Sequence, residues 1–300
     1  GMLAAKSVTT PLDIAADSAP ILYVHGQPSR TDSAVRTLEQ TAATLTVDDL
    51  ATGKTVKAIN YEADPVELKL LHMVTGDPKR TPTVALFGNT DLWLSNGSGY
   101  TDSVPASCDT TLTCEPSGGD AWNHGDVSSQ INTTFLGLVG PGVRHQGVDN
   151  AVWSDHTDIV PTMWELLGLH GDYAPDGRVL AEAIKPSALP KALRQNESLV
   201  VKLGELYKQL NAPVGGFGLD TLNISTAALA SSSGNDRVYN HLEAALTGLG
   251  VARDDVASAI QSQLLGTEFG HLPVNPRRAR ALLTAGNAIL ASASFLAAHS

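Results

Sequence analysis

One histidine in the sequence stands where a metal ligand often stands in an α/β protein. His124 is followed by Gly125, and an apolar run typical of a buried strand, Phe135 to Val139, comes shortly afterwards. Gly125 allows a close approach of the backbone, and ligands of open α/β sheets gather beyond the strand ends. We therefore expect His124 to bind a metal, while an ordinary loop histidine remains the alternative.

Two carboxylates lie close to this histidine in the sequence. Asp126 follows His124 by two residues, and Asp120 precedes it by four. A carboxylate that accepts a hydrogen bond from an imidazole ring fixes the orientation of a metal-binding histidine. Asp126, and less strongly Asp120, are candidates for this role; solvated surface carboxylates are the other interpretation.

The two cysteines, Cys108 and Cys114, lie in a polar stretch rich in Gly, Ser, Thr and Pro. Two cysteines are too few for a structural zinc site. We expect a disulfide between Cys108 and Cys114, with two free thiols as the alternative. A disulfide implies an oxidising compartment, so the prediction is a secreted or extracytoplasmic protein.

The segment after the expected strand contains strong turn and helix signals. Gly140-Pro141-Gly142 forces a sharp exit from the strand. A helix is expected from Pro161 to Leu169, with Thr157 or Asp158 as its cap and with His170-Gly171 after its end.

The elements that position these residues alternate between strand-like and helix-like patterns. Expected strands cover Ile21 to Val24 and Thr83 to Phe87, and expected helices cover Asp32 to Leu45 and a segment that begins at Asp64-Pro65. Such an order predicts a sheet with helices on both of its faces. We expect an α/β domain over residues 1–186.

Residues 187–300 have a different pattern, rich in Ala and Leu and without strand-like runs. Leucines recur at helical spacing, and Asn275-Pro276 opens a final helix. The stripes are Leu199, Leu203, Leu206 and Leu210; Leu242, Leu246 and Leu249; and Val256, Ile260 and Leu264. This part is predicted to be a helical bundle.

The order of the motifs resembles the alkaline phosphatase superfamily. The motifs are His124-Gly125, the strand, Gly140 to Val143, and Asp158-Ile159-Val160-Pro161-Thr162 before Leu166-Leu167-Gly168. The nearest branches are the nucleotide pyrophosphatase/phosphodiesterases and the sulfatase-like enzymes, and the resemblance covers roughly residues 65–182. It implies a partial three-layer alkaline phosphatase-like α/β sheet. It also implies that His124 is the last ligand of zinc or another divalent metal in an enzyme that hydrolyses phosphate esters.

The chain departs from this family in the residues that would do the chemistry. It contains no Asp-His-Gly motif, and Asp155-His156-Thr157 has threonine as its third residue. No nucleophile motif precedes His124, and one histidine cannot form a two-metal centre. We therefore predict the carboxyl-terminal part of a metal-dependent phosphoesterase or phosphodiesterase, inactive alone. The alternative is a non-catalytic binding or structural module derived from that superfamily. Phosphatase and sulfatase chemistry remain open.

Composition limits the partners. The net charge is -11, which argues against nucleic-acid binding because phosphate contacts need clusters of Lys and Arg. The sequence shows no run of about 18 apolar residues, so we expect no membrane span. A small phosphate ester is the expected substrate of the parent enzyme. If an amino-terminal half is missing, an uncovered sheet edge would favour a homodimer.

Overall fold

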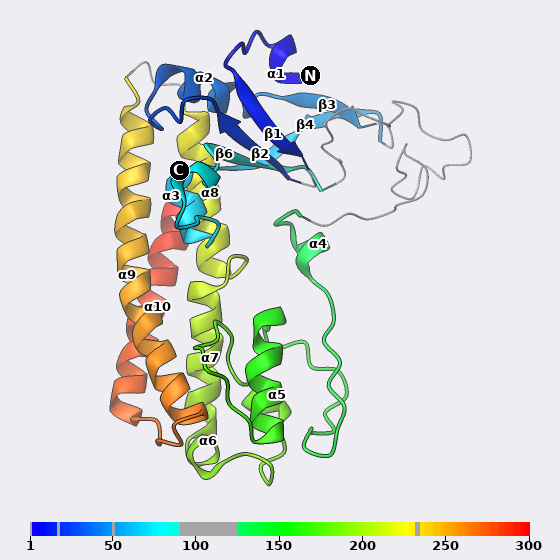
Figure 1. The fold of residues 1–300 in the computed structure, drawn as a ribbon, viewed down its shortest axis with the longest axis vertical. Coiled ribbons are helices and arrows are strands. Elements are labelled where there is room, and N and C mark those ends of the chain that lie inside the picture. The colour runs from blue at the N-terminus through cyan, green and yellow to red at the C-terminus, as the bar shows by residue number, and fades with distance from the viewer. Residues whose placement is uncertain (1, 17–18, 50–51, 91–124, 232–234) are drawn as a thin grey trace, which may run out of the picture. The chain divides into compact units, whose positions relative to one another are not determined.

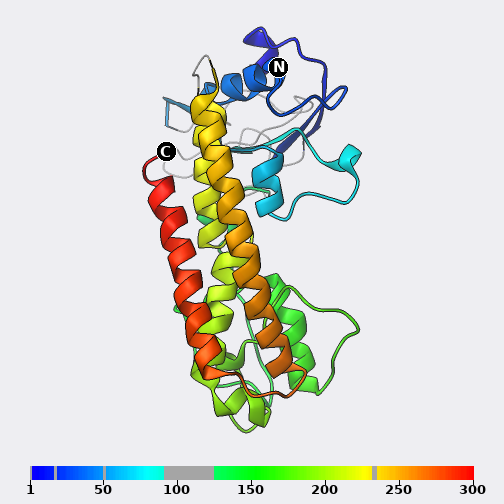
Figure 2. The same ribbon diagram turned by 90° about the vertical axis from the view of Figure 1, so that its left-hand side faces the viewer.

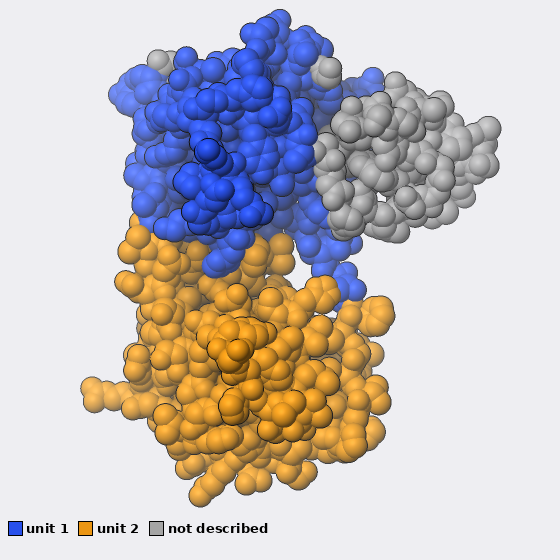
Figure 3. Space-filling model, in the orientation of Figure 1, with its two compact units in different colours: residues 1–134, 219–247, 296–300 blue, residues 135–218, 248–295 orange. Residues whose placement is uncertain are grey.

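The structure is a computed structural model that describes residues 2–16, 19–49, 52–90, 125–231 and 235–300. The chain divides into two compact units (Figure 3). Unit 1 comprises Gly1–Thr134, Leu219–Thr247 and Leu296–Ser300, and unit 2 comprises Phe135–Gly218 and Gly248–Phe295. The expected division of the chain at residue 186 stays a prediction.

Unit 1 contains an antiparallel four-stranded sheet with the strand order β1-β2-β6-β5 (Figure 1). The separate β3–β4 pair is also antiparallel. The strands are β1 Leu12–Ala16, β2 Pro20–Val24, β3 Thr46–Asp49, β4 Lys54–Lys57, β5 Ile59–Ala63 and β6 Val84–Gly88. Every residue of β6 is buried, as expected for a central strand whose two faces are both covered.

Short helices connect these strands, and their starts follow from local sequence. The Asp32 side chain accepts a hydrogen bond from the Ala34 amide and caps α2. Asp64 caps α3 in the same way, and Pro65 occupies the first helical position. The bounds are α1 Met2–Ala5, α2 Ser33–Ala42, α3 Pro65–Leu70, η1 Pro78–Arg80 and α4 Ser129–Asn132.

One face of the sheet carries an apolar cluster within unit 1. Ala85 and Phe87 alternate along β6 and so point to the same face, where Leu68 of α3 and Leu222 of α8 pack with them. Helix α8 spans Gly216–Ala230. These buried side chains place the start of α3 close to the sheet.

Unit 2 consists mainly of helices. Its elements are η2 His156–Asp158, α5 Ile159–Leu167, η3 Ala181–Ala183, α6 Lys191–Gln195 and α7 Glu197–Asn211. Helices α9 Arg237–Glu268 and α10 Pro276–Ala297 contribute residues to both units. In unit 2 their segments share one core with α7, in which Leu203, Ile260 and Ala279 are buried; Figure 2 shows α9 and α10 side by side. This arrangement confirms the predicted carboxyl-terminal helical region.

Helix α10 is the one helix, among the residues that the structure describes, long and apolar enough to cross a membrane by length and composition alone. A core helix of a soluble protein can pass the same test, but only 17% of the most apolar window of α10 is buried. The expectation of no membrane span stays a prediction.

The predicted strand from Phe135 to Val139 is wrong. These residues belong to no helix or strand, and Phe135 and Val139 are 91% and 100% exposed. A strand needs neighbouring strands for its backbone hydrogen bonds, and no described part of the chain supplies them here. The apolar pattern of this segment favours a strand, but it contains no information about a partner strand.

The helix predicted from Pro161 to Leu169 exists with different ends. It begins at Ile159 and stops at Leu167, because Gly168 adopts a left-handed φ of 65° and the Leu169 amide bonds back to the Trp164 carbonyl. The cap is also different from the prediction. Asp155 caps the preceding turn, η2, and the Asp158 side chain caps no helical amide of α5.

Candidate functional site

Four of the five residues proposed from the sequence lie outside the described residues: His124, Asp120, Cys108 and Cys114. Asp126 is described, and its carboxylate accepts a hydrogen bond from the Ser128 amide at 2.8 Å. This bond forms a local turn before α4. The orientation of the His124 ring by Asp126 stays a prediction.

A metal centre is not formed by the described residues alone. Across residues 2–16, 19–49, 52–90, 125–231 and 235–300, no three His, Cys, Asp or Glu side chains come together in a way that could hold a metal ion. These residues therefore do not fit a bound metal by themselves, and no metal-dependent step is assigned to them.

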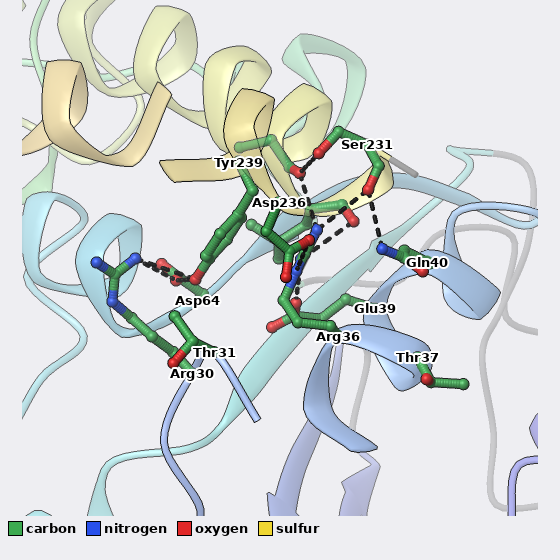
Figure 4. A network of polar contacts seen from close by, with 12 residues as sticks. Arg30, Thr31, Arg36, Thr37, Glu39, Gln40, Asp64, Ser231, Asp236 and Tyr239 are labelled. Carbon is green, nitrogen blue, oxygen red and sulfur yellow. Dashed lines mark hydrogen bonds and ion pairs between the residues drawn. The ribbon is translucent and has the colours of Figure 1, made fainter. Parts of the chain in front are cut away.

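The densest polar chemistry in unit 1 surrounds Tyr239, near the start of α9 (Figure 4). We call this group the Tyr239 cluster. Its members are Arg30, Arg36, Glu39, Asp64, Asp236, Tyr239 and Glu243. Two guanidinium groups contact the Tyr239 ring: the Cζ of Arg36 is 3.9 Å and the Cζ of Arg30 is 5.4 Å from the ring centroid. Such cation–π contacts are strongest where the groups are desolvated.

Arg36 closes the end of α8. Its guanidinium donates to the carbonyls of Ala228, Leu229 and Ser231 at 3.2–3.3 Å. The last carbonyls of a helix have no partners within that helix, and a cation is favourable at this end. Within α2, Arg36 also bonds Glu39 at 2.5 Å. Because Arg36 belongs to α2, its bonds to the carbonyls tie α2 to the end of α8.

Asp64 joins the start of α3 to α9. One carboxylate oxygen caps α3, and the other accepts from the Tyr239 hydroxyl at 3.0 Å. Arg30 donates to the same hydroxyl at 3.0 Å and to Glu243 at 2.7 Å. Both carboxylates are fully buried, whereas the Arg30 side chain is 35% exposed. Arg30 is thus the member of this contact that is accessible to solvent.

Burial shifts the proton equilibria of the acids in the Tyr239 cluster. It raises the pKa of Glu39 to about 8, against the opposing charge of Arg36. Burial, followed by the charge of Asp64, raises the pKa of Glu243 to about 9. Both shifts favour the protonated form of these acids, which reduces the excess of negative carboxylates over guanidinium groups. The cluster is then close to electrical balance.

The Tyr239 cluster has the features of a structural network. Three of its four acids, Glu39, Asp64 and Glu243, are buried and bonded to a helix end or to arginines, so a substrate would have to displace these contacts to reach them. Sequence reasoning missed it because its contacts join residues about 175–213 positions apart. A signal was present: Arg36 and Glu39 sit beside the apolar stripe of the predicted helix from Asp32 to Leu45.

A second buried polar group, the Lys208 cluster, lies in unit 2. The ammonium of Lys208 on α7 lies 2.8 Å from Asp155, 3.5 Å from Asp158 and 2.7 Å from the Thr157 hydroxyl. Burial acts to raise the pKa of Asp155, but the bonds from Lys208 and Thr157 lower it overall. Burial raises the pKa of Asp158 despite the charge of Lys208.

Three consecutive amides near this cluster are held by side chains. The Arg178 amide donates to Asp158 at 2.8 Å, the Val179 amide to Glu268 at 3.0 Å and the Leu180 amide to Thr162 at 3.0 Å. Buried amides outside regular structure need such partners. Asp158 and Thr162, four residues apart, therefore brace the segment 178–180.

A shallow pocket of about 190 Å³ lies at the end of β2. His25, Asp13 and Lys79 are among its lining residues, and the His25 ring nitrogen lies 3.2 Å from the Asp13 carboxylate. Both of these side chains are more than half exposed. Pockets for drug-sized ligands usually measure about 300–1,000 Å³, so this one could hold only a small polar molecule.

Comparison with known proteins gives no relative. No family model matches the chain, and neither a curated protein nor a solved structure matches it.

Proposed function

We propose that the chain is the carboxyl-terminal part of a metal-dependent phosphoesterase- or phosphodiesterase-like hydrolase and that it hydrolyses little or nothing alone. The finer fold proposed for the parent enzyme is a three-layer alkaline phosphatase-like sheet, followed by the helical region. His124 would bind zinc or another divalent metal, with Asp126 and Asp120 beside it. A Cys108–Cys114 disulfide and a secreted location complete this proposal.

The observation that carries the proposal is the brace formed by Asp158 and Thr162. Both belong to the motif that resembles the superfamily, and both bind backbone amides of the segment 178–180. The motif thus performs a structural task here, in agreement with the structural use that the resemblance implies for this segment. Its spacing of four residues places both side chains on the same side of the helix start, which suits a shared target.

The apolar residues exposed on α5 support the proposal that a layer of the parent domain is missing from this chain. Val160, Met163 and Leu167 recur at helical spacing and are 39%, 43% and 62% exposed. A helix normally buries its apolar stripe against another element. In a three-layer domain, a sheet would cover such a stripe, so its exposure fits a chain that lacks part of its parent domain.

The chemistry proposed for the parent enzyme needs more residues than this chain offers. When bound, a two-metal centre would activate a hydroxyl nucleophile and stabilise the leaving oxygen. The contribution of this chain would be one ligand, His124, together with the braced segment. Asp155 and Asp158 are already bonded to Lys208, and we assign them no role in ester hydrolysis.

The test is the turnover of bis-p-nitrophenyl phosphate by the purified chain with zinc supplied. We expect background rates for the wild-type chain and for His124→Ala. His170→Ala is the matched control, because His170 also precedes a glycine. Turnover that survives purification, disappears in His124→Ala and persists in His170→Ala would overturn the proposed inactivity of the isolated chain.

One observation favours the alternative of a non-catalytic binding module. Only 17% of the most apolar window of α10 is buried, and Ala281, Ala285 and Ala288 are exposed at helical spacing. If this face is an open binding surface, Ala285→Glu should leave thermal stability nearly unchanged. A clear fall in the melting temperature would show that the face is packed in the folded protein and would argue against this alternative.

A further inference from the structure

Glu268 is a buried acid at a position that disfavours its charge. It is the last residue of α9 and is only 1% exposed. The carbonyl groups at the end of a helix carry partial negative charge, so an ionised carboxylate is destabilised there. Burial adds to this effect, because it removes the water that would solvate the charge. The position therefore favours the neutral, protonated form of Glu268.

The contacts of Glu268 do not compensate for a negative charge. Its Oε1 accepts from the Val179 amide at 3.0 Å, whereas its Oε2 makes no hydrogen bond within the described residues. The guanidinium of Arg178, the residue before Val179, is bonded instead to both oxygens of Glu182 at 2.7 and 3.0 Å. An ionised Glu268 would thus have one amide donor and no bonded cation.

A second acid faces Glu268 across a contact between two helix ends. Glu165 lies in the last turn of α5. The ring of Trp164, next to Glu165, lies 5.9 Å from the ring of Phe269, next to Glu268. Burial raises the pKa of Glu165 to about 7, and burial, with a further contribution from Glu165, raises the pKa of Glu268 to about 7.

The other ionisable groups that face Glu268 come from three further parts of unit 2. They are Arg178 from the segment 178–180, Asp158 from η2 and Tyr207 from α7. Arg178 favours the ionised form of Glu268, and Asp158 opposes it as Glu165 does. Because Arg178 is bonded to Glu182, its charge offsets the effect of burial only in part.

We propose that Glu268 is a proton switch that controls how firmly the segment 178–180 is held. With its proton, Glu268 is neutral, and its carbonyl oxygen accepts from the Val179 amide. When the proton leaves, the buried anion is repelled by Glu165, and the segment opens more often because opening lets water reach the charge. This inference goes beyond the proposed function and does not depend on it.

The segment 178–180 should open more often as the pH rises. The closed segment binds the proton more tightly than the open one, because the pKa of Glu268 is about 7 when it is buried and about 4.5 ordinarily. The stabilising contribution is therefore complete below about pH 4.5 and is lost as the pH rises to about 7. Within this window, each pH unit increases opening by up to about tenfold.

Hydrogen exchange of the full chain, followed by mass spectrometry at pH 5 and pH 8, tests the proposal. After correction for the intrinsic pH dependence of exchange, protection of the Val179 peptide should fall at least about tenfold in the wild type. It should stay nearly constant in Glu268→Gln, because glutamine keeps the carbonyl oxygen but cannot ionise. Asp255→Asn, at an exposed position of α9, is the matched control and should behave like the wild type. A peptide from α7 reports global unfolding and should keep its protection.

Three results would overturn the proposal. The first is wild-type protection of the Val179 peptide that does not change between pH 5 and pH 8. The second is an equal fall in the α7 peptide, which would show global unfolding. The third is an equal fall in Glu268→Gln and Asp255→Asn, which would place the titrating group elsewhere. If Glu268→Gln does not fold, Glu165→Gln takes its place: removal of the like charge should make the fall smaller, and an unchanged fall would contradict the switch.

Discussion

The hydroxyl group of Tyr239 should contribute about 2 kcal/mol to the stability of unit 1. It donates to Asp64 at 3.0 Å and accepts from Arg30 at 3.0 Å, and both Tyr239 and Asp64 are fully buried. Hydrogen bonds to charged groups contribute about 1.5–3 kcal/mol each. Tyr239→Phe removes both bonds but keeps the ring that the two guanidinium groups contact. Arg30 retains Glu243, which limits the loss.

Urea denaturation followed by far-ultraviolet circular dichroism measures this effect as a change in the unfolding free energy. Tyr23→Phe is the matched control, because the Tyr23 hydroxyl makes no hydrogen bond within the described residues. We expect a loss of about 2 kcal/mol for Tyr239→Phe and a change within about 0.5 kcal/mol for Tyr23→Phe. Equal losses in the two variants would refute the assignment of Tyr239 as the centre of the cluster.

Two further predictions concern buried charges. Burial raises the folded-state pKa of Glu39 from the ordinary 4.5 to about 8; its stabilising contribution is therefore full below about pH 4.5 and is lost as the pH rises towards 8. The unfolding free energy of Glu39→Gln, measured by urea denaturation, should therefore rise relative to that of the wild type between about pH 5 and pH 8. A difference between the two unfolding free energies that stays constant with pH would contradict this pKa shift. Lys208→Met leaves the fully buried Asp158 without its cation and should cost about 3–5 kcal/mol in the same assay, whereas the exposed Lys202→Met should cost less than about 0.5 kcal/mol. Similar losses in these two lysine variants would argue against a stabilising Lys208 cluster.

The elements predicted correctly are those with signals in a few neighbouring residues. Asp32, Asp64-Pro65 and Asn275-Pro276 each begin a helix, and the Asn275 side chain accepts from two amides of α10. The apolar runs that predicted β2 and β6 also consist of a few neighbouring residues. Caps and short buried runs depend on contacts between residues that are adjacent in the sequence, so they can be predicted from it.

Features that depend on distant partners could not be predicted in the same way. Helix α8 is apolar on most sides and largely buried, so it has no amphipathic period to detect. The run from Phe135 to Val139 has strand composition without a described partner strand. In the Tyr239 cluster, Arg36 meets carbonyl groups about 190 positions away, and one sequence contains no record of that pairing.

The metal content of the purified chain tests the central claim most directly. Elemental analysis should find no stoichiometric zinc in the wild-type chain, and no difference between it and His124→Ala, if the catalytic centre needs residues that this chain lacks. Close to one zinc per wild-type chain, lost in His124→Ala and retained in His170→Ala, would contradict the account and would show that a usable metal site is already complete here.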